Sequence, residues 1–191
     1  MRRSRWFGKN AAMKATVFCA TSLDGYIARS DGDISWLGEP GADEDESGDN
    51  GGFTPLMESI DYLVMGRNTY EKVLTFGDWP YAKPVVVLTS RELAVPKHLS
   101  GKIETMSGSP ADIVATLASR GAKHLYVDGG NTIQRFLRAG LIHNLIVTTV
   151  PVLIGSGIPL FSEVDADIQR QHVATRTLTR GLVQSEYVVV R

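Results

Sequence analysis

Short apolar runs alternate with segments of helical periodicity over most of the chain. Residues 15–21 form an apolar run rich in β-formers that stops at the turn-forming stretch 22–25, which predicts a buried strand. Residues 62–65 and 125–127 are further apolar runs, each followed by a 3.6-residue periodicity. Residues 85–88 are continuously apolar and β-branched, as is typical of a strand covered on both faces.

Capping residues mark three predicted helices, two of them following the apolar runs at 62–65 and 125–127 and one beginning near residue 110. Ser109 followed by Pro110 is a typical helix start, because proline is tolerated at the first helical position. Glycine after the last apolar position of a helix is a typical stop signal. We therefore expect N-caps at Asn68, Ser109 and Asn131, and helix ends before Gly77, Gly121 and Gly140.

The last third of the sequence predicts strands without long helices between them, at residues 145–150, 173–178 and 182–190. Arg180-Gly181 has the chemistry of a tight hairpin turn. Together these elements predict one α/β domain with a central, mostly parallel sheet, helices on both faces and an antiparallel C-terminal hairpin. Residues 38–52 concentrate glycine and acidic residues without periodicity, which predicts a solvated loop.

Composition narrows the classes of partner. The 191 residues are 43% hydrophobic and carry a formal net charge of -1, so the chain offers neither a basic field for nucleic acid nor a surface for anionic lipid. Cys19 is the single cysteine and the four histidines share no metal-ligand spacing, so we expect no disulfide and no metal site. A cytoplasmic location fits this cysteine usage. Residues 1–12 are basic without an apolar segment, and we interpret them as a disordered extension preceding a domain at 13–191.

Three short segments that contain glycine or arginine follow predicted strands, and we call them corners because the chain turns there from a strand into the next element. Gly66-Arg67, Thr89-Ser90-Arg91 and Gly129-Gly130 each stand where a parallel strand would end. Because ligands of open α/β sheets gather outside the carboxyl ends of the strands, these corners together predict a polyphosphate site. Taken singly, the first segment is more often a capped helix with a surface arginine, and the second is more often a lone surface arginine. No G-x-G-x-x-G stretch follows the first strand, which disfavours a standard dinucleotide-binding site.

In their order these segments resemble a known superfamily. Ala20, residues 23–28, 65–71 and 88–91, and Asp128-Gly129-Gly130 resemble the dihydrofolate reductases. Residues 151–161 resemble the C-terminal reductase domain of the bacterial riboflavin-biosynthesis deaminase-reductase, the RibD C-terminal domain. The resemblance extends over about residues 14–190 and implies a three-layer dihydrofolate reductase-like fold, a homodimer and NADPH as cofactor.

The resemblance also implies a role for particular residues. Ala20 and Ile27 would meet the nicotinamide, and the cofactor pyrophosphate would lie at Gly129-Gly130, with a cis peptide there as in dihydrofolate reductases. Asp24 would be a catalytic proton relay or substrate ligand, although Asp before Gly is also ordinary turn chemistry. The other residues we assign to the cofactor are Gly66, Arg67, Asn68, Thr69, Leu88, Thr89, Ser90, Arg91, Asn131, Thr132 and Ile133, and those assigned to the substrate are Trp36, Leu153 and Gly155.

Departures from the family pattern bear on the substrate. No carboxylate in a predicted helix matches the pterin-binding acid, for which Asp49 is nearest by spacing, and Tyr26 stands where the riboflavin reductases usually carry lysine. The zinc deaminase half is absent from the sequence. We expect NADPH-dependent hydride transfer to a small heterocyclic or sugar-derived group, with 5-amino-6-(5-phosphoribosylamino)uracil as the family substrate. A dinucleotide-binding sensor or partner-binding module without turnover and a folate or pteridine reductase are the alternatives.

The apolar β-rich segments near the C-terminus favour self-association. Residues 145–150, with Val183, Tyr187 and Val189, supply more apolar surface than one small sheet face buries. A symmetric homodimer formed through the C-terminal strands is the expected assembly.

Arg91 is expected to set the preference for the phosphorylated cofactor. A charge-assisted hydrogen bond to a phosphate contributes about 1.5–3 kcal/mol, enough for a preference of about tenfold or more. NADPH should therefore bind more tightly than NADH, and Arg91→Ala should remove most of that difference. Equal dissociation constants for the two cofactors in the unmodified protein, measured by fluorescence titration, would overturn this assignment.

Overall fold

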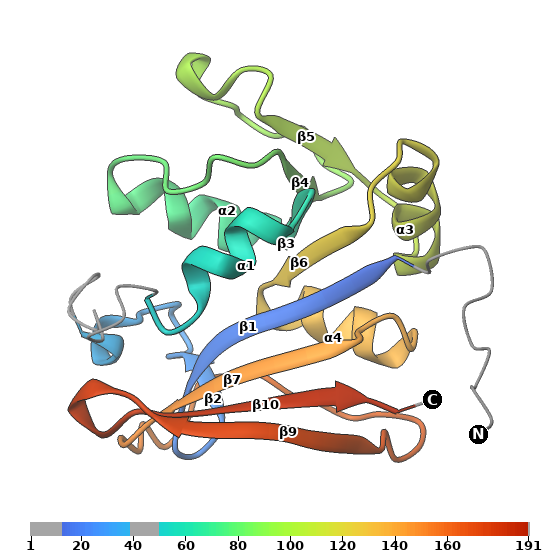
Figure 1. Ribbon diagram of the computed structural model, residues 1–191. Coiled ribbons are helices and arrows are strands. Elements are labelled where there is room, and N and C mark those ends of the chain that lie inside the picture. Colours follow the sequence, from blue (N-terminus) through green and yellow to red (C-terminus); the bar gives the residue numbers. More distant parts are fainter. Residues whose placement is uncertain (1–12, 39–49, 191) are drawn as a thin grey trace, which may run out of the picture.

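A central sheet of eight strands organises the computed structural model, which describes residues 13–38 and 50–190 (Figure 1). Adjacent strands from β5 through β7 run parallel, whereas β10 is antiparallel to both of its neighbours. The carboxyl ends of the parallel strands therefore meet at one edge of the sheet. In spatial order the strands are β5 (Ile103–Met106), β4 (Val85–Leu88), β3 (Tyr62–Gly66), β6 (His124–Asp128), β1 (Lys14–Ser22), β7 (Asn144–Val150), β10 (Val183–Val189) and β9 (Arg170–Thr177).

Helices cover both faces of this sheet. On the near side in Figure 1 lie α1 (Phe53–Ser59) and α2 (Arg67–Val73), and on the far side α3 (Pro110–Ser119) and α4 (Gly130–Arg138). Two separate apolar clusters result, because alternate side chains of each strand point to opposite faces. Leu63, Met65 and Val87 pack with α1 and α2, whereas Val64, Val86 and Val127 pack with α3 and α4. The predicted three-layer arrangement and its antiparallel C-terminal hairpin are confirmed.

A small second sheet was not anticipated. The strands β2 (Tyr26–Ala28) and β8 (Ile158–Pro159) pair antiparallel, and the Gln134 side chain of α4 donates a hydrogen bond to the Pro159 carbonyl at 2.9 Å. This sheet joins the turn after β1 to the start of α4. It thereby packs a segment of the last third of the chain against the first.

The start of α3 and the turn between β9 and β10 agree with what the local sequence predicts. Ser109 and Asp112 form the reciprocal hydrogen bonds of a capping box, as expected for the start of α3. In the hairpin between β9 and β10, Arg180 has a positive φ of 59°, in accord with the predicted tight turn. The four 3-10 helices in the described residues are Ser35–Leu37, Leu74–Phe76, Lys97–Leu99 and Thr179–Gly181.

Helix α1 and strand β5 are additions to the predicted elements. Phe53, Leu56, Met57 and Ile60 recur at helical spacing and pack in the same apolar cluster. That periodicity could have revealed α1, but it spans two turns only. The proposed extension at 1–12, most of the acidic loop, and Asp49 lie outside the described residues.

Neither a helix of sufficient length and apolarity to cross a membrane nor a cluster of three potential metal-ligating side chains occurs in residues 13–38 and 50–190.

The C-terminal strands carry the surface that we propose for the homodimer. Leu145 and Val150 are buried within the subunit itself, so they cannot supply the interface expected from the sequence. Exposed apolar side chains remain at Val173 and Val183, which are 51% and 40% accessible, and no helix lies over β9 in Figure 1. A second copy would cover this surface.

Charge placed on this surface should dissociate the dimer. The double variant Val173→Lys/Val183→Lys should sediment as a monomer at micromolar concentration, because each new ammonium group would need costly desolvation in the interface. Val95→Lys, at an exposed valine between β4 and β5, should leave the assembly unchanged. A monomeric unmodified protein at the same concentration would contradict the proposal.

Candidate functional site

Three corners predicted from the sequence meet at the carboxyl edge of the parallel sheet. Strand β3 lies between β4 and β6, with Gly66 beside Leu88 and Met65 beside Asp128. The residues that follow these three strands are therefore neighbours in space. The register places the Gly66, Thr89 and Gly129 corners in one row, as the polyphosphate hypothesis requires.

The glycines at the ends of β3 and β6 permit a reciprocal close approach. Gly129 has a φ of 86°, and the position that a Cβ would take there is filled by the Thr69 hydroxyl of α2. A Cβ at Gly66 would lie 3.0 Å from the Thr132 hydroxyl of α4. Thus α2, which follows β3, places a threonine against the glycine after β6. In the same way α4, which follows β6, places a threonine against the glycine at the end of β3. Side chains larger than hydrogen would push these two corners apart.

The predicted asparagine caps are wrong. Gly66 and Gly129 are the N-cap residues of α2 and α4, and neither helix start has a side-chain cap hydrogen bond. Asn68 and Asn131 lie one or two residues inside the helices and are exposed. Since no side chain accepts from these first-turn N–H groups, they are available to an anion at the sheet edge.

Gly130 packs closely against the small second sheet. A Cβ there would lie 3.0 Å from Ile27 Cδ1 and 3.2 Å from both Ile158 Cγ2 and the Pro159 carbonyl oxygen. The missing side chain therefore makes room for the β2–β8 sheet, and the assignment of Gly130 to the cofactor stays a prediction. No cis peptide bond occurs among the described residues, so the cis Gly129-Gly130 bond that we considered is wrong.

Arg67 and Arg91 differ in whether their side chains already have partners within the protein. Arg67 Nε lies 2.8 Å from Glu71 Oε1, and its Nη2 donates to the Glu92 carbonyl at 2.7 Å. Arg91 is exposed, and its side chain has no hydrogen-bond or ion-pair partner among the described residues. Its backbone N–H donates to the Thr89 hydroxyl at 3.1 Å, which orders the turn. Arg91 is accordingly the arginine with its full charge available to a phosphate.

The expected nicotinamide contacts lie beside the small sheet. Ala20 pairs with Thr148 of β7 and is half-buried, and Ile27 is half-buried in β2. Two other cofactor candidates, Thr132 and Ile133, are buried, with Ile133 entirely inside the core. Ile133 can therefore meet a cofactor only through its backbone.

Asp24 joins the turn after β1 to the loop that precedes β8. Its carboxylate accepts hydrogen bonds from the backbone N–H groups of Gly155 at 2.7 Å and Ile154 at 3.3 Å. The Ser22 hydroxyl, followed by these N–H groups, lowers the pKa of Asp24, so the side chain is an exposed carboxylate. A carboxylate of this kind positions the loop and would be a poor proton donor. Its assignment as a catalytic residue stays a prediction.

The substrate candidates come from two different segments of the chain. Leu153 is 69% exposed beside Gly155 on the loop that Asp24 holds. Trp36 lies in a separate 3-10 helix, where its indole N–H is buried without a hydrogen-bond acceptor among the described residues. These assignments too remain predictions.

Asp128 is a candidate that the sequence interpretation quoted only as part of a motif. It ends β6, and its Oδ1 accepts from the Gly129 N–H at 2.7 Å. Burial raises the pKa of Asp128 to about 6, although the Gly129 N–H opposes the shift. The charge of Asp128 in turn helps to raise the pKa values of Cys19, Tyr81 and Tyr126, after the larger effect of burial. Among these groups only Asp128 exchanges a proton near neutral pH.

Aromatic residues surround the same strand ends on the α1 side of the sheet. The rings of Phe18 and Phe53 are 5.6 Å apart, and Phe53 meets Tyr126 edge-on at 6.3 Å. The Tyr126 hydroxyl donates to the Phe18 carbonyl at 3.0 Å, which links β6 to β1. Asp128 lies two residues after Tyr126 in β6 and so faces the same side of the sheet as this cluster.

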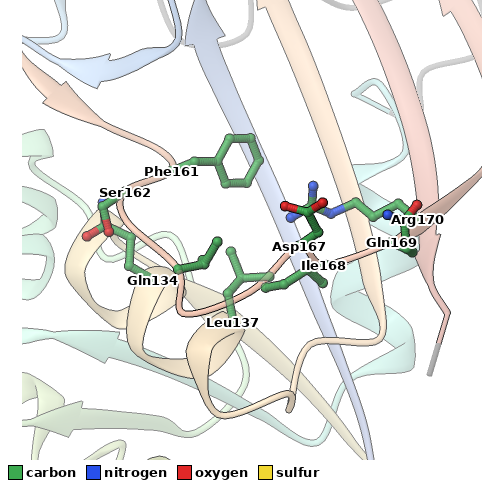
Figure 2. Close-up of a pocket in the computed structure, with 9 residues that line it drawn as sticks. Gln134, Leu137, Phe161, Ser162, Asp167, Ile168, Gln169 and Arg170 are labelled. Atoms are coloured by element: carbon green, nitrogen blue, oxygen red, sulfur yellow. The ribbon is translucent and has the colours of Figure 1, made fainter.

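Two cavities lie away from the glycine corners. One, of about 190 Å³, is lined by Phe18, Gly52, Ile146 and Gln184, among others, beside the start of α1. The other, of about 380 Å³, lies between α4 and the segment leading into β9 (Figure 2). The second shares none of the residues that the sequence assigned to the cofactor.

Comparison with known proteins decides the family. The model of the RibD C-terminal domain matches residues 13–184. The chain belongs to the RibD C-terminal domain family. A putative riboflavin biosynthesis protein from Shewanella sp. PV-4 is 41% identical, with a TM-score of 0.85 over 94% of this chain and 100% of that one. The family and superfamily suggested by the sequence are thus confirmed.

More distant structures share the fold. A Thermotoga maritima diaminohydroxyphosphoribosylaminopyrimidine deaminase/5-amino-6-(5-phosphoribosylamino)uracil reductase has a TM-score of 0.71 at 14% identity, over 94% of this chain and 57% of that one. Dihydrofolate reductase from Enterococcus faecalis, complexed with NADP(H) and RAB-propyl, has a TM-score of 0.66 at 19% identity, over 95% and 98% of the two chains. The RibD C-terminal domain thus shares its architecture with reductases.

Asp128 should make folding stability depend on pH in a defined direction. Its pKa is raised from 3.8 to about 6 in the folded protein, so the folded state holds more protons than the unfolded state between these values. This contribution to stability is present at low pH and is lost as pH rises toward 6 and above. Asp128→Asn should therefore raise the free energy of unfolding at pH 8 by about 3 kcal/mol, with little gain at pH 4.

Urea unfolding at both pH values measures this effect, and Asp165→Asn in an exposed loop is the matched control. The control should shift stability equally at pH 4 and pH 8. A constant difference between Asp128→Asn and the unmodified protein across this range would contradict a raised pKa.

Proposed function

We propose that this RibD C-terminal domain protein is an NADPH-dependent reductase of a small heterocyclic or sugar-derived C=N or C=O group. The observation that carries the proposal is the row of corners at the sheet edge, where uncapped helix starts stand beside the free guanidinium of Arg91. Backbone N–H groups and one unpaired arginine form a donor set suited to a dinucleotide with an additional phosphate. Family membership and the reductase fold of its structural neighbours support the same chemistry.

Different residues at the sheet edge would bind different parts of the cofactor. The N–H groups that begin α2 and α4 would bind the pyrophosphate, and Arg91 with Thr89 and Ser90 would bind the additional phosphate. Ala20 and Ile27 would form the apolar surface beneath the nicotinamide. NADPH, when bound, supplies the hydride.

Asp128 would supply the proton that completes the reduction. Hydride addition to the carbon of a C=N or C=O group leaves electrons on nitrogen or oxygen, which must accept one proton. With a pKa of about 6, Asp128 retains a protonated fraction near neutral pH, while Tyr81 and Tyr126 hold their protons too firmly to exchange them. The burial that raises its pKa would also keep water away from this transfer.

The substrate would bind on the α1 side of the sheet, because Asp128 stands among the side chains of that face. A pyrimidine such as 5-amino-6-(5-phosphoribosylamino)uracil is the first compound to test, since a reductase of that substrate shares the fold. Turnover of bound cofactor separates this proposal from a dinucleotide sensor, which would bind NADPH and leave it unoxidised.

Asp128→Asn provides the test of mechanism. The amide retains the hydrogen-bond acceptor for the Gly129 N–H but cannot donate an acidic proton, so kcat should fall about 100-fold while the dissociation constant of NADPH is unchanged. In the unmodified protein kcat should decline as pH rises above about 6, whereas the variant should lack this decline. NADPH oxidation followed by absorbance measures both.

Asp165→Asn is again the control and should retain the full rate and pH profile. An Asp128→Asn variant with unaltered kcat would remove Asp128 from the mechanism. Failure of the unmodified protein to bind NADPH at all would overturn the proposed function itself.

A further inference from the structure

The cavity behind α4 is built from a hydrophobic floor and a polar wall. Its volume is about 380 Å³, within the range of small-molecule sites. Leu137 of α4 and Ile168 form the floor, and Phe161 lies across the cavity from them in Figure 2. Both floor residues belong to the main apolar cluster, so the cavity rests on well-packed structure.

This cavity is separate from the proposed cofactor site. Gly130 begins α4 at the sheet edge, whereas Leu137 lies seven residues further along the helix, about 10 Å away at the helical rise. The Gln134 side chain between them already donates to the Pro159 carbonyl. A molecule in the cavity would therefore contact the far half of α4 without occupying the row of corners.

Arg170 gives the cavity one positive charge without a matched acid. Its guanidinium carbon lies 5.1 Å from the centre of the Phe161 ring. Asp167 also lines the cavity, yet within the described residues neither it nor any other carboxylate comes within ion-pair distance of Arg170. Partial desolvation lowers the pKa of Arg170, as expected for a cation that has lost water without gaining a counter-charge.

We propose that this cavity binds a small planar aromatic monocarboxylate. A carboxylate matches the flat fork of a guanidinium with two parallel hydrogen bonds, and the ring would fill the apolar space between Phe161 and Leu137. One cation and one carboxylate line the cavity, so a monoanion is favoured over a phosphate dianion, which Asp167 would repel more strongly.

Titration with sodium benzoate, followed by NMR chemical shifts or calorimetry, tests this inference. Benzoate should bind saturably, benzyl alcohol of similar size should not, and inorganic phosphate should bind more weakly than benzoate. Arg170→Gln should weaken benzoate binding by about tenfold or more, because it removes the charge that the carboxylate pairs with. Phe161→Leu should weaken it by a smaller factor, since the cavity keeps an apolar wall but loses its aromatic face.

Asp167→Asn gives a prediction of opposite sign. Removal of the nearby negative charge should tighten benzoate binding about threefold, an effect that damage to the fold would not produce. The matched control is Arg120→Gln, at an exposed arginine paired with Glu104 of β5, the edge strand of the sheet opposite to β9, and it should leave the affinity unchanged. Thermal unfolding of every variant confirms that the comparison is between folded proteins.

Equal binding of benzyl alcohol and benzoate, or an unchanged affinity in Arg170→Gln, would overturn the proposal. The titration is repeated with saturating NADPH, and benzoate should bind with the same stoichiometry. Because the readout is binding of benzoate and not turnover, its result is independent of whether the chain proves to be a reductase.

Discussion

Close packing between the ends of β3 and β6 holds the candidate site together. Thr69 of α2 fills the space beside Gly129, and Thr132 of α4 lies against Gly66, so each strand end is closed by the helix that follows the other. The two helix starts can approach only because Gly66 and Gly129 lack a Cβ. The same lack of side chains leaves first-turn N–H groups without internal acceptors, and this combination of tight packing with free donors suits the edge to an anion.

The raised pKa of Asp128 depends on its place beside Gly129 at the end of β6. It lies one residue before the glycine corner, which places its carboxyl among Cys19, Tyr81 and Tyr126, where burial disfavours the charged form. One hydrogen bond from Gly129 compensates only in part. A buried acid costs stability at neutral pH, and such a cost is typical of sites where a proton must be exchanged.

Polar links between distant segments frame the site on either side. Asp24 holds the loop before β8 through two backbone N–H groups. On the opposite face, the buried Gln184 side chain donates to the Gly51 carbonyl and to the Thr148 hydroxyl, and accepts from Arg176. That one amide connects the C-terminal strands to the start of α1. The hydrogen bonds of Gln184 satisfy polar groups that would otherwise oppose burial.

The sequence by itself determined the strands of the parallel sheet apart from β5, the helix α3 with its Ser109 cap, and the order of the glycine corners. These features depend on neighbours along the chain, because period, capping and turn preference are local properties. Only the tertiary structure decided that Gly130 faces Ile27 and Pro159, that Arg67 donates to the Glu92 carbonyl, and that the Asp128 pKa is raised. Those outcomes arise from groups far apart in sequence, whose proximity and loss of water exist only once the sheet has assembled.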